Sequence, residues 1–278
     1  MAEPATVREA VALAAARLAD GSETPRLDAE LLMAEALGVS REAMLLSGMG
    51  GAVPAAFAGL VARRAGHEPV AYILGRRAFW TLELGVTPDV LIPRPDSETL
   101  IEAALANCVA PPAAILDLGT GSGALLLATL AEWPEARGVG IDRSAGAVAV
   151  ASRNARALGL ADRAEIREGD WGEGVAGPFD LILCNPPYVE AGARLPPDVA
   201  LHEPSSALFA GADGLDDYRV LMPQIRRLLA PAGLAILEIG HRQAAAVRSL
   251  AEAHGLAAEV RVDLAGRDRA ILLRRTQV

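Results

Sequence analysis

Lysine is absent from this chain, and its 26 basic side chains of the Lys and Arg type are all arginine. A lysine general base and a lysine Schiff base are therefore excluded. Cysteine is nearly absent too, since Cys108 and Cys184 are the only two, and they lie far apart without the spacing of metal ligands. We expect neither a disulfide framework nor a zinc site, and no metal-binding residue is predicted.

Long apolar runs are also missing. No stretch of about 18 uncharged apolar residues could span a bilayer, and residues 1–9 have neither the basic nor the apolar segment of a signal peptide. We expect a cytoplasmic, monomeric protein with no membrane partner. The formal net charge of -9 at pH 7 disfavours broad attraction to phosphate backbones, so no direct nucleic-acid partner is expected.

The chain has 278 residues, of which 52% are hydrophobic, and this is enough for two modest domains. Residues 1–75 have a helical pattern, in which one helix should begin at Pro25 and end at Gly38. We see no paired carboxylates, metal-ligand spacing or nucleophile with a base here, so we predict a packing or partner-recognition domain. The apolar stripe of the helix that begins at Pro25 should consist of Leu27, Leu31, Ala34 and Leu37.

The pattern changes after residue 75. Residues 76–92 partly alternate between apolar and polar side chains, which predicts a hairpin linker. In residues 93–278 strands and helices alternate, which predicts a doubly wound α/β domain. Near its start, Asp96 or Ser97 should cap a helix. The proline- and glycine-rich residues 189–214 should form a structureless loop that lies over the site.

A glycine-rich turn separates an apolar strand at residues 114–118 from a helix at residues 124–131. Glycines let a backbone approach a ligand closely and expose N–H groups at a helix N-terminus. The next strand ends at Asp142, in the position where an acidic residue binds a ribose hydroxyl pair. Trp171 suits contact with a purine ring, or equally a role as a loop anchor. The motif that contains the end of the first strand and this glycine-rich turn consists of Asp117, Leu118, Gly119, Thr120, Gly121, Ser122 and Gly123.

The second motif ends the apolar strand at residues 179–184 and consists of Asn185, Pro186, Pro187 and Tyr188. The prolines end the strand because they have no N–H donor, and they hold the residues before them extended. The Asn185 side-chain oxygen and the Pro186 carbonyl could then accept the two hydrogens of a planar NH2 group beside Tyr188. The alternative is that the motif is only a turn.

In this order, the two motifs resemble class I S-adenosylmethionine-dependent methyltransferases that modify planar nitrogens. Residues 68–75, 93–98 and 213–219 are similar to the PrmC/HemK family of peptide chain release factor N5-glutamine methyltransferases. The resemblance covers nearly the whole chain. It implies a class I methyltransferase (Rossmann-like) seven-stranded sheet with an antiparallel last strand, and a small helical N-terminal domain that recognises the substrate.

The resemblance also implies a cofactor, a substrate and the residues that bind them. S-adenosyl-L-methionine would bind through Gly119, Thr120, Gly121, Ser122 and Gly123 at its methionine part, Asp142 at its ribose and Trp171 at its adenine, with Asn185 nearby. The target is the glutamine of a Gly-Gly-Gln motif in release factors. It would contact Asn185, Pro186, Pro187 and Tyr188, among which Asn185, Pro186 and Tyr188 would be catalytic.

Alternative functions remain open at this point. The motif of Asn185 is also found in enzymes that methylate a nucleic-acid base such as adenine, or a glutamine of a ribosomal protein. A dinucleotide-dependent oxidoreductase is a weaker alternative, because its third glycine should come one residue later than Gly123. A non-enzymatic adaptor is weaker still.

Overall fold

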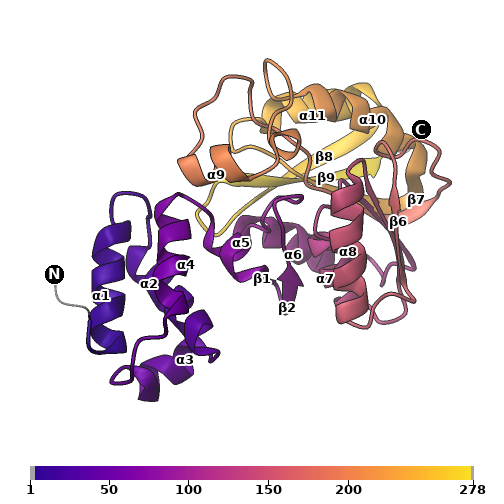
Figure 1. The fold of residues 1–278 in the computed structure, drawn as a ribbon. Coiled ribbons are helices and arrows are strands. Elements are labelled where there is room, and N and C mark those ends of the chain that lie inside the picture. Colours follow the sequence, from indigo (N-terminus) through magenta and orange to yellow (C-terminus); the bar gives the residue numbers. More distant parts are fainter. Residues whose placement is uncertain (1–3, 277–278) are drawn as a thin grey trace. The chain divides into compact units, whose positions relative to one another are not determined.

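The structure is a computed structural model that describes residues 4–276, so residues 1–3 and 277–278 of the two predicted domains lie outside it (Figure 1). The chain folds into two compact units. Unit 1 contains residues 4–76 and 195–202, and unit 2 contains residues 77–194 and 203–276. The segment 195–202 thus belongs to the helical unit. Within residues 4–276, no helix is long and apolar enough to cross a membrane.

Unit 1 consists of helices. Helix α1 (Val7–Leu18) begins with a capping box, in which the Thr6 hydroxyl accepts from the Glu9 N–H and the Glu9 carboxylate accepts from the Thr6 N–H. Helix α2 (Pro25–Leu37) begins and ends as predicted, with Gly38 at a φ of 67° as its C-cap. The others are α3 (Arg41–Ala43), the π-helical turn η1 (Met44–Gly48), α4 (Ala56–Ala65), α5 (Val70–Leu74) and α9 (Pro197–His202).

The buried face of α2 differs from the predicted stripe. Leu27 is 40% exposed, whereas Asp28, Leu32 and Met33 are buried. The Asp28 carboxylate pairs with Arg64 of α4, whose Nε lies 2.7 Å from Asp28 Oδ2. Because a buried carboxylate must be paired, the ion pair keeps Asp28 inside and Leu27 outside. The prediction was wrong at Leu27 because it considered apolar residues alone.

Unit 2 is built on a seven-stranded sheet in the order β5-β4-β3-β6-β7-β9-β8. The strands from β5 to β7 in this order are parallel, and β9 is antiparallel to both its neighbours, which confirms the predicted fold class. The strands are β3 (Ala114–Leu118), β4 (Arg137–Asp142), β5 (Ala164–Glu168), β6 (Phe179–Cys184), β7 (Leu229–Glu238), β8 (Leu256–Val262) and β9 (Asp268–Arg275).

Helices cover both faces of this sheet (Figure 1). Leu181 and Leu183 of β6 belong to a core with α6, α7 and α8, whereas Ile182 and Cys184 face a core with α10 and α11. This alternation buries the strand on both sides. The helices are α6 (Glu98–Asn107), α7 (Ala124–Glu132), α8 (Ala145–Ala157), α10 (Asp216–Leu228) and α11 (Ala244–Ala253), and a predicted hairpin is formed by β1 (Arg76–Phe79) and β2 (Leu82–Gly85).

Two local predictions were only partly right. Residues 189–214 are not structureless, because they contain α9, the 3-10 turn η3 (Ser205–Ala207) and a bridge between Val189 and Phe209. Ser97 ends the 3-10 turn η2 (Pro95–Ser97) and stands at the N-cap position of α6, as predicted, but its side chain makes no capping hydrogen bond. Its hydroxyl donates to Glu238 instead.

Candidate active site

A pocket in unit 2 lies at the carboxyl ends of the parallel strands. The strand register pairs Leu118 of β3 with Ile141 of β4 and with Cys184 of β6, so the loops that follow these strands meet at one edge. The predicted residues that line the pocket are Gly119, Thr120, Gly121, Ser122, Asp142, Trp171, Asn185 and Pro187. Gly123, Pro186 and Tyr188 lie directly beside lining residues in the chain but do not line the pocket themselves.

The glycine turn is fastened to the end of β4. The N–H groups of Gly119 and Thr120 both donate to the Ile141 carbonyl at 2.9 Å, and the Gly121 N–H donates to Asp142 Oδ2 at 2.9 Å. Gly119 and Gly121 have φ values of 72° and 54°, a backbone region that residues other than glycine rarely adopt. The turn therefore requires glycine for its conformation.

Asp142 supports this turn and lines the pocket. Its Oδ1 accepts from the Ser144 N–H at 2.9 Å while its Oδ2 accepts from Gly121. A carboxylate has about four acceptor positions, so both oxygens can still accept hydrogen bonds from hydroxyl groups of a ligand. This arrangement is compatible with the predicted ribose contact.

Asp117 is a buried acid that lines the pocket. It belongs to the glycine-rich motif, but the sequence predicted no function for it. Its Oδ2 accepts from the Thr120 hydroxyl at 2.6 Å, whereas its Oδ1 has no hydrogen-bond partner. Burial raises the pKa of Asp117 to about 7, assisted by the charge of Asp142 and opposed by Thr120 and the Leu126 N–H. An unpartnered buried carboxylate oxygen suits a cationic group of a ligand.

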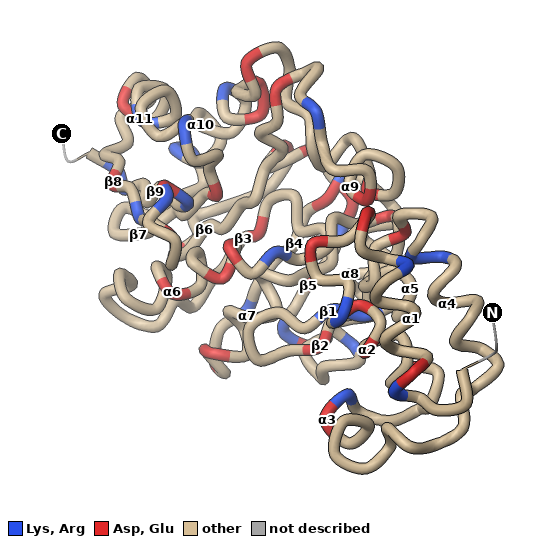
Figure 2. The backbone as a smooth tube through the Cα atoms, turned by 90° about the vertical axis from the view of Figure 1, so that its left-hand side faces the viewer, with Lys and Arg blue, Asp and Glu red and all other residues tan. Residues whose placement is uncertain are grey.

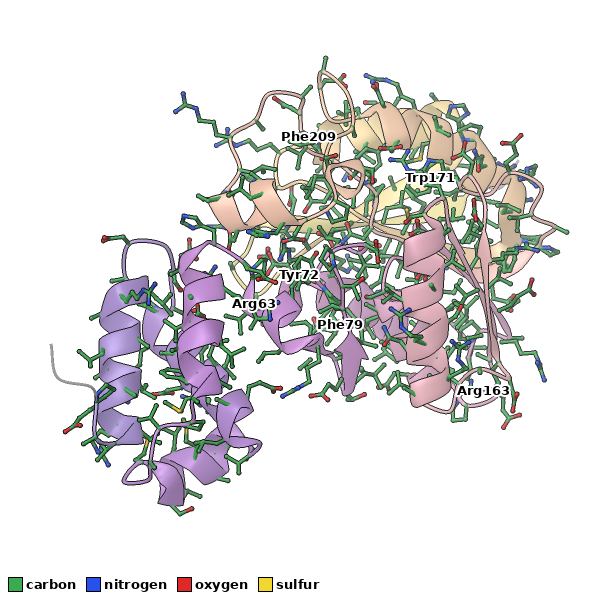
Figure 3. The ribbon with its side chains drawn as sticks, in the orientation of Figure 1. Arg63, Tyr72, Phe79, Arg163, Trp171 and Phe209 are labelled. Carbon is green, nitrogen blue, oxygen red and sulfur yellow. The ribbon has the colours of Figure 1, made fainter. Side chains whose placement is uncertain are left out.

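Trp171 stands beside the glycine turn and next to α10 (Figure 3). The loop of Trp171 is anchored to α10, because the Gly172 N–H donates to Gln224 Oε1 at 2.6 Å. Burial raises the pKa of the Asp217 carboxyl of α10, against the effects of Arg143 and Trp171. The loop is thus anchored while the indole lies on the pocket wall, so the two predicted roles are compatible. A planar wall of this kind suits an aromatic ring.

The corner after β6 is held from behind by a buried acid. Asn185 Nδ2 donates to Ser97 Oγ at 3.3 Å, and Ser97 Oγ donates to Glu238 Oε2. Tyr188 OH donates to Glu238 Oε1 at 3.0 Å. Burial, with the nearby Glu238 charge, raises the pKa of Tyr188, so the phenol keeps the proton that it donates.

Sequence reasoning missed Ser97 and Glu238. Glu238 is 1% exposed at the end of β7, after the apolar residues 234–237. A lone acidic residue at the end of a buried strand was the available signal, because burying a carboxylate is costly unless it is hydrogen-bonded. Ser97 gave no comparable signal, since a serine before a helix is most simply interpreted as a cap.

Part of the segment 189–214 does line the pocket, as predicted, through Pro204, Ser206 and Ala207. The segment is fixed at Glu203, whose carboxylate accepts from the Ile92 N–H at 3.2 Å and from Arg94 at 2.5 Å. Arg143 also donates to the Ser206 carbonyl at 3.0 Å. Residues 203–207 thus form part of the pocket wall and are tied to unit 2, which contains the pocket.

Two family models match long parts of this chain. A family model described as the PrmC N-terminal domain matches residues 9–75, and one described as a methyltransferase small domain matches residues 96–201. Among solved structures, a methyltransferase from Pyrococcus furiosus has a TM-score of 0.56 at 15% identity and covers 78% of this chain and 98% of that chain. A 16S rRNA N2 G1207 methyltransferase from Thermus thermophilus has a TM-score of 0.53 at 20% identity, covering 72% and 49%. These two show the fold alone.

Curated relatives are much more similar. A release factor glutamine methyltransferase of Rhodospirillum rubrum is 51% identical and covers 92% of this chain and 80% of its own. Proteins of the same name from Caulobacter vibrioides and Cereibacter sphaeroides are 44% and 46% identical, and they cover 92% and 96% of this chain and 92% and 99% of their own. With this identity over nearly its whole length, the chain belongs to the release factor glutamine methyltransferase family, as its motifs predicted.

Proposed function

We propose that this protein transfers a methyl group from S-adenosyl-L-methionine to the side-chain amide nitrogen, N5, of the glutamine in the Gly-Gly-Gln motif of peptide chain release factors. One observation carries the chemistry: the Asn185 NH2 group is engaged by Ser97, which leaves the Asn185 oxygen as an acceptor at the pocket. The names of relatives at 44 to 51% identity support the substrate.

The residues present fit the cofactor. S-adenosyl-L-methionine supplies an electrophilic methyl group bonded to a positively charged sulfur. Asp117 Oδ1, buried and without a partner, would bind the ammonium group of its methionine part. Asp142 would accept from the ribose hydroxyls, and Trp171 would contact the adenine. Gly119 leaves room for this contact, because a side chain there would meet the indole.

The chain would act mainly by alignment. An amide nitrogen is a poor nucleophile because its lone pair is delocalised, so the substrate amide must be held in one orientation. The Asn185 oxygen and the Pro186 carbonyl would accept its two hydrogens, and Tyr188 would support it from the side. Alignment of this kind can lower a barrier by about 7 to 11 kcal/mol.

Unit 1 would recognise the release factor. In the part of the chain that the structure describes, unit 1 exposes large apolar side chains, of which Leu46 is 88% exposed: Leu13, Leu27, Val39, Leu45, Leu46 and Leu201. Exposed apolar residues of this size suit contact with a protein. Basic and acidic residues are interspersed along the backbone (Figure 2), which favours a protein over a phosphate backbone. A monomeric state and a cytoplasmic location stay predictions.

The function is tested by locating the methyl group. The protein is incubated with isotope-labelled S-adenosyl-L-methionine and, in separate reactions, with a release factor, ribosomal proteins or DNA. Peptide mass spectrometry of the first reaction should place the label on the side-chain nitrogen of the Gly-Gly-Gln glutamine. Label on a nucleic-acid base or a ribosomal protein, with an unmodified release factor, would contradict the proposal.

A further inference from the structure

Three polar side chains from distant parts of the chain form a line behind the pocket. Glu238 ends β7, Ser97 ends the turn η2, and Asn185 follows β6. Glu238 and Ser97 are 1% and 4% exposed, so water does not compete for their hydrogen bonds. Asn185 and Ser97 line the pocket, and Glu238 lies behind them.

The direction of each hydrogen bond follows from the chemistry of its groups. An ionised carboxylate can only accept, and a hydroxyl has a single proton. The Ser97 proton is therefore used by Glu238 Oε2, and Ser97 Oγ can only accept from Asn185. Of the two ends of the Asn185 amide, only the NH2 group can donate, so the Asn185 oxygen must point away from Ser97.

We propose that Glu238 and Ser97 are positioning residues that set which end of the Asn185 amide faces the substrate. This inference rests on the proposed function, in which the substrate presents an NH2 group that needs an acceptor. Turned by 180° about its last side-chain bond, the Asn185 amide would instead present its own NH2 group, and two donors would face each other. Glu238 acts on the substrate through Ser97 and Asn185. It acts separately through Tyr188, which donates to its other oxygen, so the Ser97 variants isolate the route through Asn185.

The surroundings of Glu238 are consistent with an acceptor. Burial raises the pKa of Glu238, while Ser97, Tyr188 and the Arg269 charge oppose the rise and Asp96 adds to it. Arg269 Nη1 lies 3.9 Å from Glu238 Oε1, and the Arg269 guanidinium also pairs with Asp96 and Asp263. Donors thus face both carboxylate oxygens. Tyr218 of α10 donates only to the main-chain oxygen of Glu238, at 2.7 Å.

A kinetic comparison separates positioning from stability. Ser97→Ala and Glu238→Gln should slow single-turnover methyl transfer about tenfold to a hundredfold, by analogy with residues that orient metal ligands through hydrogen bonds, and leave the affinity for S-adenosyl-L-methionine unchanged. Ser97→Thr keeps the hydroxyl and should keep the rate. Tyr218→Phe removes a buried hydrogen bond of the same residue without touching Ser97, so it serves as the matched control and should also keep the rate.

A double-mutant comparison asks whether Ser97 acts through Asn185. In the Asn185→Ala background there is no amide to orient, so adding Ser97→Ala should slow the reaction no further. An additional loss as large as in the wild-type background would overturn the proposal, because Ser97 would then act on the reaction by another route.

Side-chain NMR tests the same line without any methyl transfer. The chain has three asparagines, Asn107, Asn154 and Asn185, so labelling asparagine with 15N gives three NH2 pairs, and Asn185→Ala identifies the one in question. Glu238→Gln should shift the Asn185 pair as Ser97→Ala does, while the Asn107 and Asn154 pairs and the Tyr218→Phe spectrum stay unchanged.

The two ideas can fail separately. An Asn185 pair that is unaffected by Glu238→Gln would overturn the positioning role, whatever the substrate is. If Glu238→Gln shifts the Asn185 NH2 pair but the protein does not methylate release factors, the hydrogen-bonded line is supported and only the proposed function is contradicted. If Glu238→Gln loses cofactor binding, Ser97→Ala and Ser97→Thr give the same comparison.

Discussion

Gly119 lies against Trp171 so closely that a Cβ atom added to Gly119 would come 3.0 Å from the indole Cζ3 atom. Gly119 also has a φ of 72°, so Gly119→Ala should both strain the turn and displace the indole. We expect at least a tenfold loss of affinity for S-adenosyl-L-methionine, equivalent to about 1.4 kcal/mol, in titration calorimetry.

Gly38 provides the matched control. Its φ of 67° is similar, but a Cβ atom there would meet nothing within 4 Å. Gly38→Ala should lower the free energy of unfolding by about 1 to 2 kcal/mol through backbone strain alone and leave cofactor affinity unchanged. Equal affinities for the two variants would mean that the contact between Gly119 and Trp171 does not shape the cofactor site.

Asp117 should make stability depend on pH. Its pKa is about 7 in the folded protein, against 3.8 for the free group, so between these values the folded state binds more protons than the unfolded chain. The stabilisation is fully present below about pH 4 and is lost as pH rises through 7, by an amount on the order of 4 kcal/mol. Denaturant titrations should show this loss between about pH 4 and pH 7, with no further loss from this group above pH 7.

Asp117→Asn should remove this pH dependence of the free energy of unfolding. The same ionisation should tighten cofactor binding as pH rises, because only the carboxylate form attracts an ammonium group. In the asparagine variant the affinity should be weaker and nearly independent of pH over this range. Parallel pH profiles for wild type and Asp117→Asn would show that another group titrates.

Arg64 should be essential for the stability of unit 1. It is 7% exposed and pairs with the buried Asp28, so Arg64→Ala leaves a carboxylate without its cation and should cost about 3 to 5 kcal/mol. Arg63 pairs with Glu68 at the surface, where its side chain is 46% exposed, and Arg63→Ala should cost no more than about 1 kcal/mol. Chemical denaturation followed by circular dichroism measures both, and similar costs would contradict the buried role.

Leu46 tests the recognition role of unit 1. Leu46→Asp should raise the KM for the release factor about tenfold, the effect of losing 1.4 kcal/mol of contact energy, and leave kcat and cofactor affinity unchanged. Val109 of unit 2 is 94% exposed, so Val109→Asp is the control for a new surface charge. If both variants keep the wild-type KM, Leu46 is not part of the recognition surface.

Much of unit 2 could be predicted because its signals are local. The strands β3 and β6 have the predicted bounds, since each is an apolar run that ends at a glycine turn or shortly before a proline. Gly38 and Pro25 likewise mark the ends of α2. These residues restrict the backbone whatever lies around them.

Buried polar pairs could not be predicted in the same way. Ser97 and Glu238 are 141 positions apart, and Asp28 and Arg64 are 36 apart. Ser97, Asp28 and Arg64 alone resemble ordinary surface or cap residues. Glu238 alone does not show which residue it pairs with, because only the fold brings the partners together. The orientation of the Asn185 amide depends on such a pair, so the motif identified the acceptor but not the residues that orient it.

The most direct test of the account is the single-turnover rate of Asn185→Ala at saturating S-adenosyl-L-methionine with a release factor as substrate. Loss of the acceptor should raise the barrier by about 3 to 4 kcal/mol and slow transfer roughly a hundredfold or more. Asn185→Asp keeps an acceptor but attracts the cofactor's positive sulfur before reaction, so its rate should lie between the two. An alanine variant within a few-fold of wild type would show that the corner at Asn185 is only a turn.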